Sequence, residues 1–162
     1  MRLIHPLKPF IQKDSQILIL GSFPSVLSRE SGFYYGNPQN RFWRLLALLL
    51  AEGTPGTVQE KQAMLVKHRI ALWDVIESCD IWGSSDSSIR YTQPAHIAEK
   101  IPGTNLQHIL INGSAAGRLY IKHQAVDVKL PYSILPSTSS ANVSYSMDRL
   151  AERWSIILDG LK

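Results

Sequence analysis

The stretch Gln16–Trp43, QILILGSFPSVLSRESGFYYGNPQNRFW, decides the fold of this chain. It opens with the apolar run Ile17–Leu20, which is typical of a strand buried in a parallel sheet. Asn37 and Pro38 then indicate a helix start, because an Asn side chain can accept an orphan backbone N–H and Pro suits the first helical position. Asn40 would then lie in the first helical turn and face whatever the preceding turn and loop enclose. We therefore interpret the stretch as half of an active site.

Apolar runs and helical patterns alternate along the rest of the chain. The sequence predicts strands at Gln16–Leu20, Ile70–Ile76, His108–Ile111 and Tyr132–Leu135, and helices at Pro38–Ala51, Thr57–Lys67, Thr92–Ile101, Ser114–Lys122 and Ser146–Leu158. Irregular chain is expected at Met1–Ser15, Gly21–Gly36 and Glu77–Ser88. Because strands alternate with helices, we expect a mostly parallel sheet with helices on both faces. No linker or repeat interrupts the pattern, so residues 1–162 should form one domain.

Composition narrows the class of protein. The chain has 162 residues, a net charge of +4 and one cysteine, Cys79. A single cysteine excludes a disulfide framework, so we expect a cytoplasmic protein. No apolar run approaches the length of a membrane span, and no membrane association is expected. The positive charge is a mild indication of a polyanionic partner such as nucleic acid, although an ordinary basic enzyme would carry the same charge.

Small and polar turns follow three of the predicted strands, at Gly21–Ser25, Asn112–Ser114 and Pro136–Asn142. Ligands bind outside the carboxyl ends of parallel strands, so we expect these turns at one edge of the sheet. The five histidines, His5 among them, are dispersed, and no metal or cofactor motif occurs in the sequence, so none is expected to bind. Asp74 closes a predicted strand and could face the cleft, with a structural hydrogen bond as its expected role. The predicted site therefore consists of amides, hydroxyls and aromatic rings, without an evident general base.

Four segments resemble the uracil-DNA glycosylase superfamily, and most closely its hypoxanthine-DNA (deoxyinosine) glycosylase branch. They are Ile17–Ser25 (ILILGSFPS), Tyr34–Trp43 (YYGNPQNRFW), Ile111–Gly113 (ING) and Leu135–Asn142 (LPSTSSAN), in the family order. The mismatch-specific uracil/thymine glycosylases are similar at a greater distance. The resemblance implies a three-layer α/β/α sandwich with a short, mostly parallel central sheet. It also implies a monofunctional base-excision repair enzyme that hydrolyses the N-glycosidic bond of a deaminated base, with hypoxanthine the first candidate and uracil the second.

The resemblance also assigns catalytic residues, although both standard catalytic groups of the superfamily are absent. Phe23 stands where relatives carry a water-activating Asp or Asn, and Leu135 stands where they carry a His. In the hypoxanthine branch, the catalytic role falls to asparagines that match Asn40 and Asn112. We assign Asn40 to positioning the water, and Asn112 to recognising the purine edge and stabilising the departing base.

The remaining predicted contacts hold the flipped base and the DNA. Tyr35 matches the base-stacking aromatic ring of the relatives, while Tyr34, Phe42 and Trp43 are expected to be core residues. The backbone N–H groups of Ser22 and Phe23 are candidates for contact with the base oxygen. Groove and phosphate contacts are assigned to the loop residues Pro136, Ser137, Thr138, Ser139, Ser140 and Asn142. The expected partner is double-stranded DNA carrying a deaminated base, bound by a monomer.

Two other functional classes remain open. One is a non-catalytic nucleic-acid-binding domain of the same fold, which the missing Asp and His support and the paired Asn40 and Asn112 oppose. The other is an esterase or nucleotide hydrolase, which would need a nucleophile with a nearby base, and the sequence has no such spacing. At single residues, the structural alternatives are a helix cap for Asn40 and a plain capping loop for Ser137–Asn142.

Overall fold

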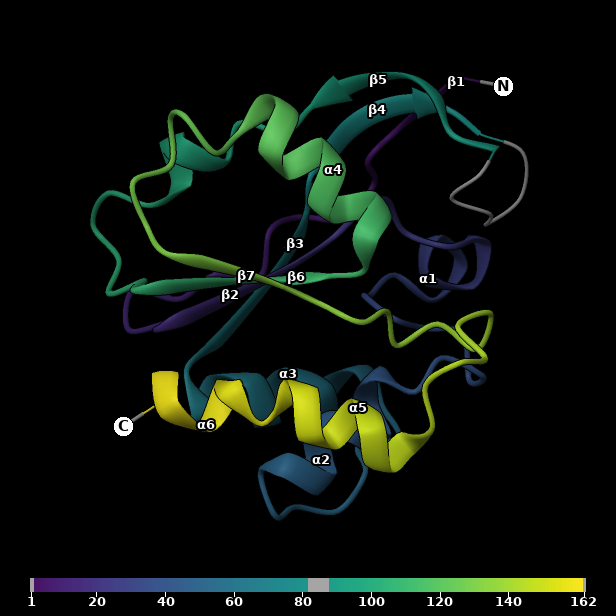
Figure 1. Ribbon diagram of the computed structural model, residues 1–162, viewed down its shortest axis with the longest axis vertical. Coiled ribbons are helices and arrows are strands. Elements are labelled where there is room, and N and C mark those ends of the chain that lie inside the picture. The colour runs from purple at the N-terminus through teal and green to yellow at the C-terminus, as the bar shows by residue number, and fades with distance from the viewer. Residues whose placement is uncertain (1, 82–87, 162) are drawn as a thin grey trace.

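Two β-sheets organise the computed structural model, which describes residues 2–81 and 88–161 (Figure 1). The strands are β1 (Arg2–Ile4), β2 (Ile17–Gly21), β3 (Ile70–Asp74), β4 (Ile76–Asp80), β5 (Arg90–Pro94), β6 (His108–Asn112) and β7 (Tyr132–Leu135). The helices are α1 (Val26–Ser31), α2 (Phe42–Leu49), α3 (Val58–His68), α4 (Ser114–His123), α5 (Met147–Trp154), α6 (Ile156–Gly160) and the 3₁₀ helix η2 (Ile97–Lys100). A parallel sheet has the strand order β3-β2-β6-β7, and an antiparallel sheet has the order β1-β4-β5. Within the described residues, no helix has the length and apolar character needed to span a membrane.

The parallel sheet is the middle of three layers. β2 is a buried central strand, with β3 hydrogen-bonded on one side and β6 on the other. Its side chains alternate between two cores: Ile17 and Ile19 pack with residues of α2, α3 and α5, while Leu18 and Leu20 pack with α4 and the antiparallel sheet. Figure 1 shows α2, α3, α5 and α6 below the sheet and α4 above it. The prediction of a mostly parallel sheet with helices on both faces is confirmed.

Several predicted elements form with small changes at their ends. Helix α3 begins with a capping box, in which the Thr57 hydroxyl accepts the Glu60 N–H and the Glu60 carboxylate accepts the Thr57 N–H. Ser146 caps α5 as predicted, but the helix expected over Ser146–Leu158 divides at Ser155 into α5 and α6. The strand expected over Ile70–Ile76 ends at Asp74, and the chain then enters β4.

The antiparallel sheet was not predicted. The predictions of irregular chain at Met1–Ser15, a loop at Glu77–Ser88 and a helix at Thr92–Ile101 are wrong where β1, β4 and β5 form, and residues 82–87 of the predicted loop lie outside the described residues. Strand β1 pairs with β4 so that Arg2 lies opposite Asp80. Such short strands carry no readable periodicity, because their pairing partners are distant in the sequence. This sheet nevertheless matters for the site, since it carries the N-terminal segment back to the parallel sheet.

The helix expected at Pro38 begins later, at Phe42. The Asn37 side chain accepts the Gln39 N–H, which makes a local turn ahead of the helix and not a helix cap. Asn40 likewise precedes the helix and accepts the Phe42 N–H through its side-chain oxygen at 2.9 Å. The predictions of an Asn37 cap and of Asn40 inside the first turn are therefore wrong. Asn40 still lies directly before the start of α2, and its carboxamide has a fixed orientation.

Two further boundaries differ from the predicted ones. Helix α1 lies inside the expected loop Gly21–Gly36 and is capped by the Ser25 hydroxyl, which accepts the Ser28 N–H at 3.1 Å. Helix α4 has Gly113 at its cap position, with a φ of 99°, and Ser114 is the first helical residue instead of the cap. A positive φ favours glycine, so Gly113 allows β6 to turn directly into α4.

Candidate active site

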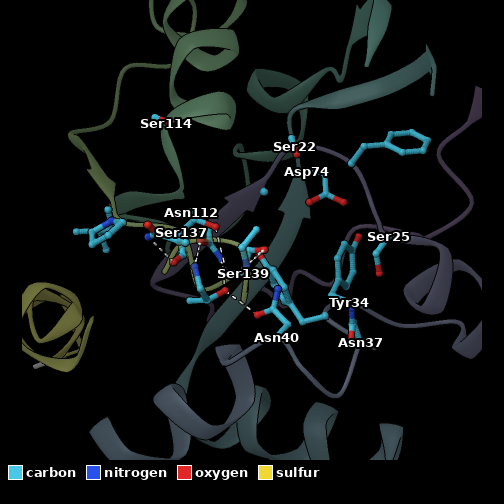
Figure 2. Close-up of a pocket in the computed structure, with 18 of the residues that line it drawn as sticks. Ser22, Ser25, Tyr34, Asn37, Asn40, Asp74, Asn112, Ser114, Ser137 and Ser139 are labelled. Carbon is cyan, nitrogen blue, oxygen red and sulfur yellow. Dashed lines mark hydrogen bonds between the residues drawn. The ribbon is translucent and has the colours of Figure 1, made fainter. Parts of the chain in front are cut away.

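A cavity of about 850 Å³ lies at the carboxyl ends of the parallel strands (Figure 2). Its lining includes the last residue of each strand of that sheet: Gly21 of β2, Asp74 of β3, Asn112 of β6 and Leu135 of β7. The three small and polar turns expected at one edge of the sheet therefore meet there, as predicted.

The cavity also gathers the residues predicted for the site. It is lined by Ser22, Phe23, Tyr35, Asn40, Asn112, Pro136, Ser137, Thr138, Ser139 and Asn142. Ser140 is the predicted site residue that is not part of the lining. The sequence interpretation therefore identified the residues that surround the cavity, whereas their individual roles remain predictions.

Asn40, Thr138 and Asn112 form a hydrogen-bonded group that we call the Asn–Thr–Asn cluster. The Thr138 hydroxyl donates to Asn40 Oδ1 at 2.7 Å and accepts from Asn112 Nδ2 at 3.0 Å. The Thr138 backbone N–H donates to Asn112 Oδ1 at 3.0 Å. Figure 2 shows Asn112 and Asn40 within one group of dashed hydrogen bonds. The cluster ties the end of β6, the start of α2 and the loop after β7 into one unit.

Backbone donors fix the direction of both carboxamides. The Phe42 N–H must meet an oxygen on Asn40, and the Thr138 N–H must meet an oxygen on Asn112. The Asn40 oxygen thus accepts two hydrogen bonds and is saturated. The amino group is the part of the Asn40 side chain that can serve a ligand. The cluster therefore presents hydrogen-bond donors to the cavity.

Thr138 joins the two asparagines. Its side chain is fully buried and its hydroxyl is bonded on both sides within the cluster. The predicted contact of Thr138 with DNA stays a prediction. Thr138 sets the positions of the two asparagines.

Arg41 holds the loop after β7 against the start of α2. Its guanidinium donates to the backbone carbonyls of Ser139, Asn142 and Tyr145, and its backbone N–H donates to the Thr138 carbonyl at 3.0 Å. These carbonyls come from one loop, so a single side chain gives the loop a defined shape. The sequence interpretation did not single out Arg41, because its partners lie about a hundred positions away.

The side chain of Asp74 forms a buried pair with His5. His5 Nε2 lies 2.7 Å from Asp74 Oδ2, and each side chain is only 5% exposed. The hydrogen bond predicted for Asp74 is therefore present, and its carboxylate also faces the cavity. The expectation that only amides, hydroxyls and aromatic rings form the site is wrong, because this carboxylate lines the cavity. Burial, followed by the nearby Asp74 charge, raises the pKa of the Tyr34 phenol and keeps it protonated.

Aromatic rings form another part of the cavity lining. The Tyr35 ring stacks on Phe42, with ring centroids 4.0 Å apart and an angle of 17° between the rings. The Trp43 indole N–H donates to the backbone carbonyls of Tyr34 and Tyr35, which holds the loop that carries them. Tyr34, Phe42 and Trp43 are at most 5% exposed, so their predicted place in the core is confirmed. Tyr35 is thus a ring backed on one face by the core.

Positive charge and backbone donors lie at the rim of the cavity. Arg153 of α5 lines the cavity and donates to the Tyr145 hydroxyl at 3.1 Å, while Arg149 lies 4.5 Å from the Tyr145 ring centre. The first residue of α4, Ser114, is also in the lining. The start of a helix presents unpaired N–H groups that favour a negative ligand. Among the described residues, no group of three or more His, Cys, Asp or Glu could hold a metal ion.

Comparisons with known proteins agree with this geometry. The uracil DNA glycosylase superfamily matches residues 8–159. A hypoxanthine DNA glycosylase of Methanosarcina acetivorans is 35% identical over 153 residues, which cover 91% of this chain and 92% of the relative. A hypoxanthine DNA glycosylase of Methanosarcina barkeri is 33% identical over 138 residues, covering 83% and 85%. A solution NMR structure from Methanosarcina acetivorans, named as a candidate uracil DNA glycosylase, has a TM-score of 0.83 at 30% identity and covers 99% of each chain.

Proposed function

The chain belongs to the uracil DNA glycosylase superfamily and is a DNA glycosylase, and from that premise we propose that it removes hypoxanthine from deoxyinosine in double-stranded DNA. Residues 1–162 would act as one domain and as a monomer, in the cytoplasm, where the unpaired, buried Cys79 suits a reducing environment. The observation that carries the choice of base is the Asn–Thr–Asn cluster, whose fixed amides offer donors to a carbonyl. The names of the two Methanosarcina relatives support the same choice.

Base recognition follows from the direction of these amides. Hypoxanthine has a carbonyl where adenine has an amino group, so a fixed donor accepts the deaminated base and opposes the normal one. We propose that the amino groups of Asn40 and Asn112 supply such donors. Because the Asn40 oxygen is already saturated, Asn40 would bind the base and not hold the attacking water, which revises the role assigned from the sequence.

The flipped base needs a surface to replace the stacking that it loses. Extruding a base costs a few kcal/mol, and aromatic stacking returns roughly 1–3 kcal/mol. The Tyr35 ring is our candidate, since Phe42 supports it from behind at 4.0 Å. The backbone N–H groups of Ser22 and Phe23 remain candidates for the base oxygen. A cavity of about 850 Å³ has room for a purine nucleotide.

Cleavage of the glycosidic bond leaves negative charge on the departing base and positive character on the sugar. The donors of the Asn–Thr–Asn cluster and the start of α4 would stabilise the departing anion. The loop residues Pro136, Ser137, Ser139, Ser140 and Asn142 would contact the DNA backbone. Arg153, which lines the cavity, and Arg149, which lies against the Tyr145 ring, would add charge for the phosphates.

A panel of labelled duplexes tests this function. Each duplex carries one deoxyinosine, deoxyuridine or mismatched thymine, and abasic sites are detected as strand breaks after alkali with enzyme in excess. We expect breaks at deoxyinosine that the Asn40→Ala variant loses. Breaks mainly at deoxyuridine would overturn the choice of base. Binding of every duplex without breaks would overturn the enzymatic function and favour the non-catalytic alternative.

A further inference from the structure

We propose that Asp74 is the catalytic carboxylate of this enzyme, and that His5 is the residue that positions it. Asp74 would accept a proton from the water that attacks the sugar, a role that no motif in the sequence assigned to it. This inference rests on the glycosylase function proposed for the same cavity. It fills the gap left by Phe23 and Leu135, which cannot supply the acid or base chemistry of their counterparts in relatives.

Asp74 has the functional group and the location that this role requires. Among the described residues that line the cavity, it is the only carboxylate. It ends β3, next to Gly21 at the end of β2, so it lies at the carboxyl ends of the parallel strands, where the other residues of the site also lie. Figure 2 shows Asp74 and Ser22 on one side of the pocket and Asn112 and Ser137 on the other. The carboxylate therefore faces the cavity from the side opposite Asn112.

The two oxygens of Asp74 have different surroundings. Oδ2 is bonded to His5 Nε2 at 2.7 Å, whereas Oδ1 faces Gly21. A methyl group built on Gly21 would lie 2.7 Å from Asp74 Oδ1 and 3.1 Å from the Tyr35 hydroxyl oxygen. Glycine thus allows Oδ1 to lie this close to the end of β2. Oδ2 anchors the carboxylate to His5, and we assign Oδ1 to the attacking water.

His5 is itself held firmly, as a positioning group must be. Its Nδ1 lies 2.9 Å from the Leu7 backbone oxygen and 3.2 Å from the Leu7 nitrogen. Its ring meets Phe23 edge-on with centroids 5.5 Å apart. The backbone N–H of His5 donates to the backbone carbonyl of Glu77 in β4 at 2.7 Å, which continues the pairing of β1 with β4. The antiparallel sheet therefore positions the His5 imidazole beside Asp74.

A purely structural clasp explains these contacts less well. A buried pair of ionisable side chains is a costly way to join two segments, since apolar side chains of similar size often do so with equal or greater stability. A clasp would also have no need to place its carboxylate in the lining of a cavity. A carboxylate beside a cavity, oriented by an imidazole, is the arrangement expected of a general base.

The proposed step balances as a hydrolysis. The water oxygen forms a bond to C1′ of the sugar as the bond from C1′ to the base nitrogen breaks. The electron pair of the broken bond leaves with the base as an anion, which the Asn–Thr–Asn cluster and the start of α4 stabilise. The water proton passes to Asp74 Oδ1 and from there to solvent or to the departed base. The carboxylate charge also favours the positive character that the sugar gains before bond formation is complete.

The test compares Asp74→Asn with Asp80→Asn in single-turnover excision of hypoxanthine. Asn has the same shape and can still accept the His5 hydrogen bond, but it cannot take a proton. We expect the Asp74→Asn rate to fall on the order of 10²-fold, while the affinity for the duplex stays unchanged. Asp80 pairs with Arg2 of β1 at 3.7 Å and does not line the cavity, so Asp80→Asn should keep the normal rate.

Two further variants separate catalysis from folding. In Asp74→Ala, added formate can occupy the vacated space and should restore part of the rate, which a structural role could not explain. His5→Gln keeps a donor near Asp74 and should retain far more activity than His5→Ala, at similar thermal stability. An Asp74→Asn rate equal to that of the unchanged enzyme would overturn the inference and leave the glycosylase function standing. So would a folded Asp74→Ala that formate does not rescue. If the unchanged enzyme releases no base from any duplex, the function itself fails, and the inference fails with it.

Discussion

The two sides of the cavity differ in chemistry and in how the chain builds them. On one side, the Asn–Thr–Asn cluster is neutral: Asn112 ends β6, Thr138 lies in the loop after β7 and Asn40 lies just before α2. On the other side, which we call the charged side, the ionisable residues Asp74 and His5 are hydrogen-bonded to each other and are separated by 69 positions. The neutral side suits recognition of a base and the charged side suits activation of a water. The difference indicates that a site lacking the usual catalytic motifs can still hold a carboxylate, supplied from outside them.

The largest expected loss of excision rate comes from replacing the two asparagines of the neutral side. Asn40→Ala and Asn112→Ala should each slow single-turnover excision on the order of 10²-fold, because each removes a fixed donor that faces the departing base. Asn105→Ala, at an exposed position that does not line the cavity, is the matched control and should have the normal rate. Full activity in both cavity variants would show that neither Asn40 nor Asn112 takes part in catalysis.

A smaller effect is expected from narrowing the space on the charged side. Gly21→Ala places a methyl group 2.7 Å from Asp74 Oδ1, so the carboxylate must move. A displacement of about 1 Å can cost up to 10²-fold, and we expect a loss of roughly 10-fold or more in the excision rate. Gly53→Ala meets no atom within 4 Å and should leave the rate unchanged. Equal rates for the two variants would show that excision does not depend on the position of the Asp74 carboxylate.

The smallest expected effect concerns the pH dependence of thermal stability, and it comes from His108, a titratable residue outside the cavity. His108 begins β6, the strand that Asn112 ends, and burial lowers the pKa of its imidazole below the ordinary 6.5. The unfolded chain then binds more protons than the folded one, so stability falls as the pH drops below about 6.5. His108→Gln should lessen the fall in thermal midpoint between about pH 7.5 and pH 5.5, by roughly 2 °C, without changing the excision rate. His96→Gln, at an exposed side chain, serves as the control, and a changed rate in His108→Gln would contradict this separation.

The sequence located the asparagines of the neutral side because the signals that mark them are local, although the hydrogen bonds that join them to Thr138, one of which spans 98 positions, were not predicted. An apolar run identifies β2, and the ends of β2, β6 and β7 point to the turns that line the cavity. Asn112 follows from those turns together with the family resemblance, and Asn40 follows from the expected helix start together with the same resemblance. Parallel strands then bring the turns to one edge without further information.

The charged side could not be predicted because it depends on pairing between distant segments. Strand β1 has only three residues, and its register against β4 decides where His5 lies. The start of α2 at Phe42 has a similar cause, since Arg41 is bonded to carbonyls of the loop after β7. Neither set of contacts leaves a periodic trace in the sequence. Local patterns therefore gave the layers and the turns, whereas the carboxylate and its partner required the tertiary structure.

The most direct test of this account is a double-mutant cycle across the cavity. Single-turnover release of hypoxanthine from a deoxyinosine duplex is measured for the unchanged enzyme, Asn40→Ala, Asp74→Asn and the double variant. If Asn40 acts on the departing base and Asp74 acts on the water, the two losses should multiply, to on the order of 10⁴-fold in the double variant. A double variant no slower than the slower single one would contradict the account, because the two sides would then serve one and the same interaction.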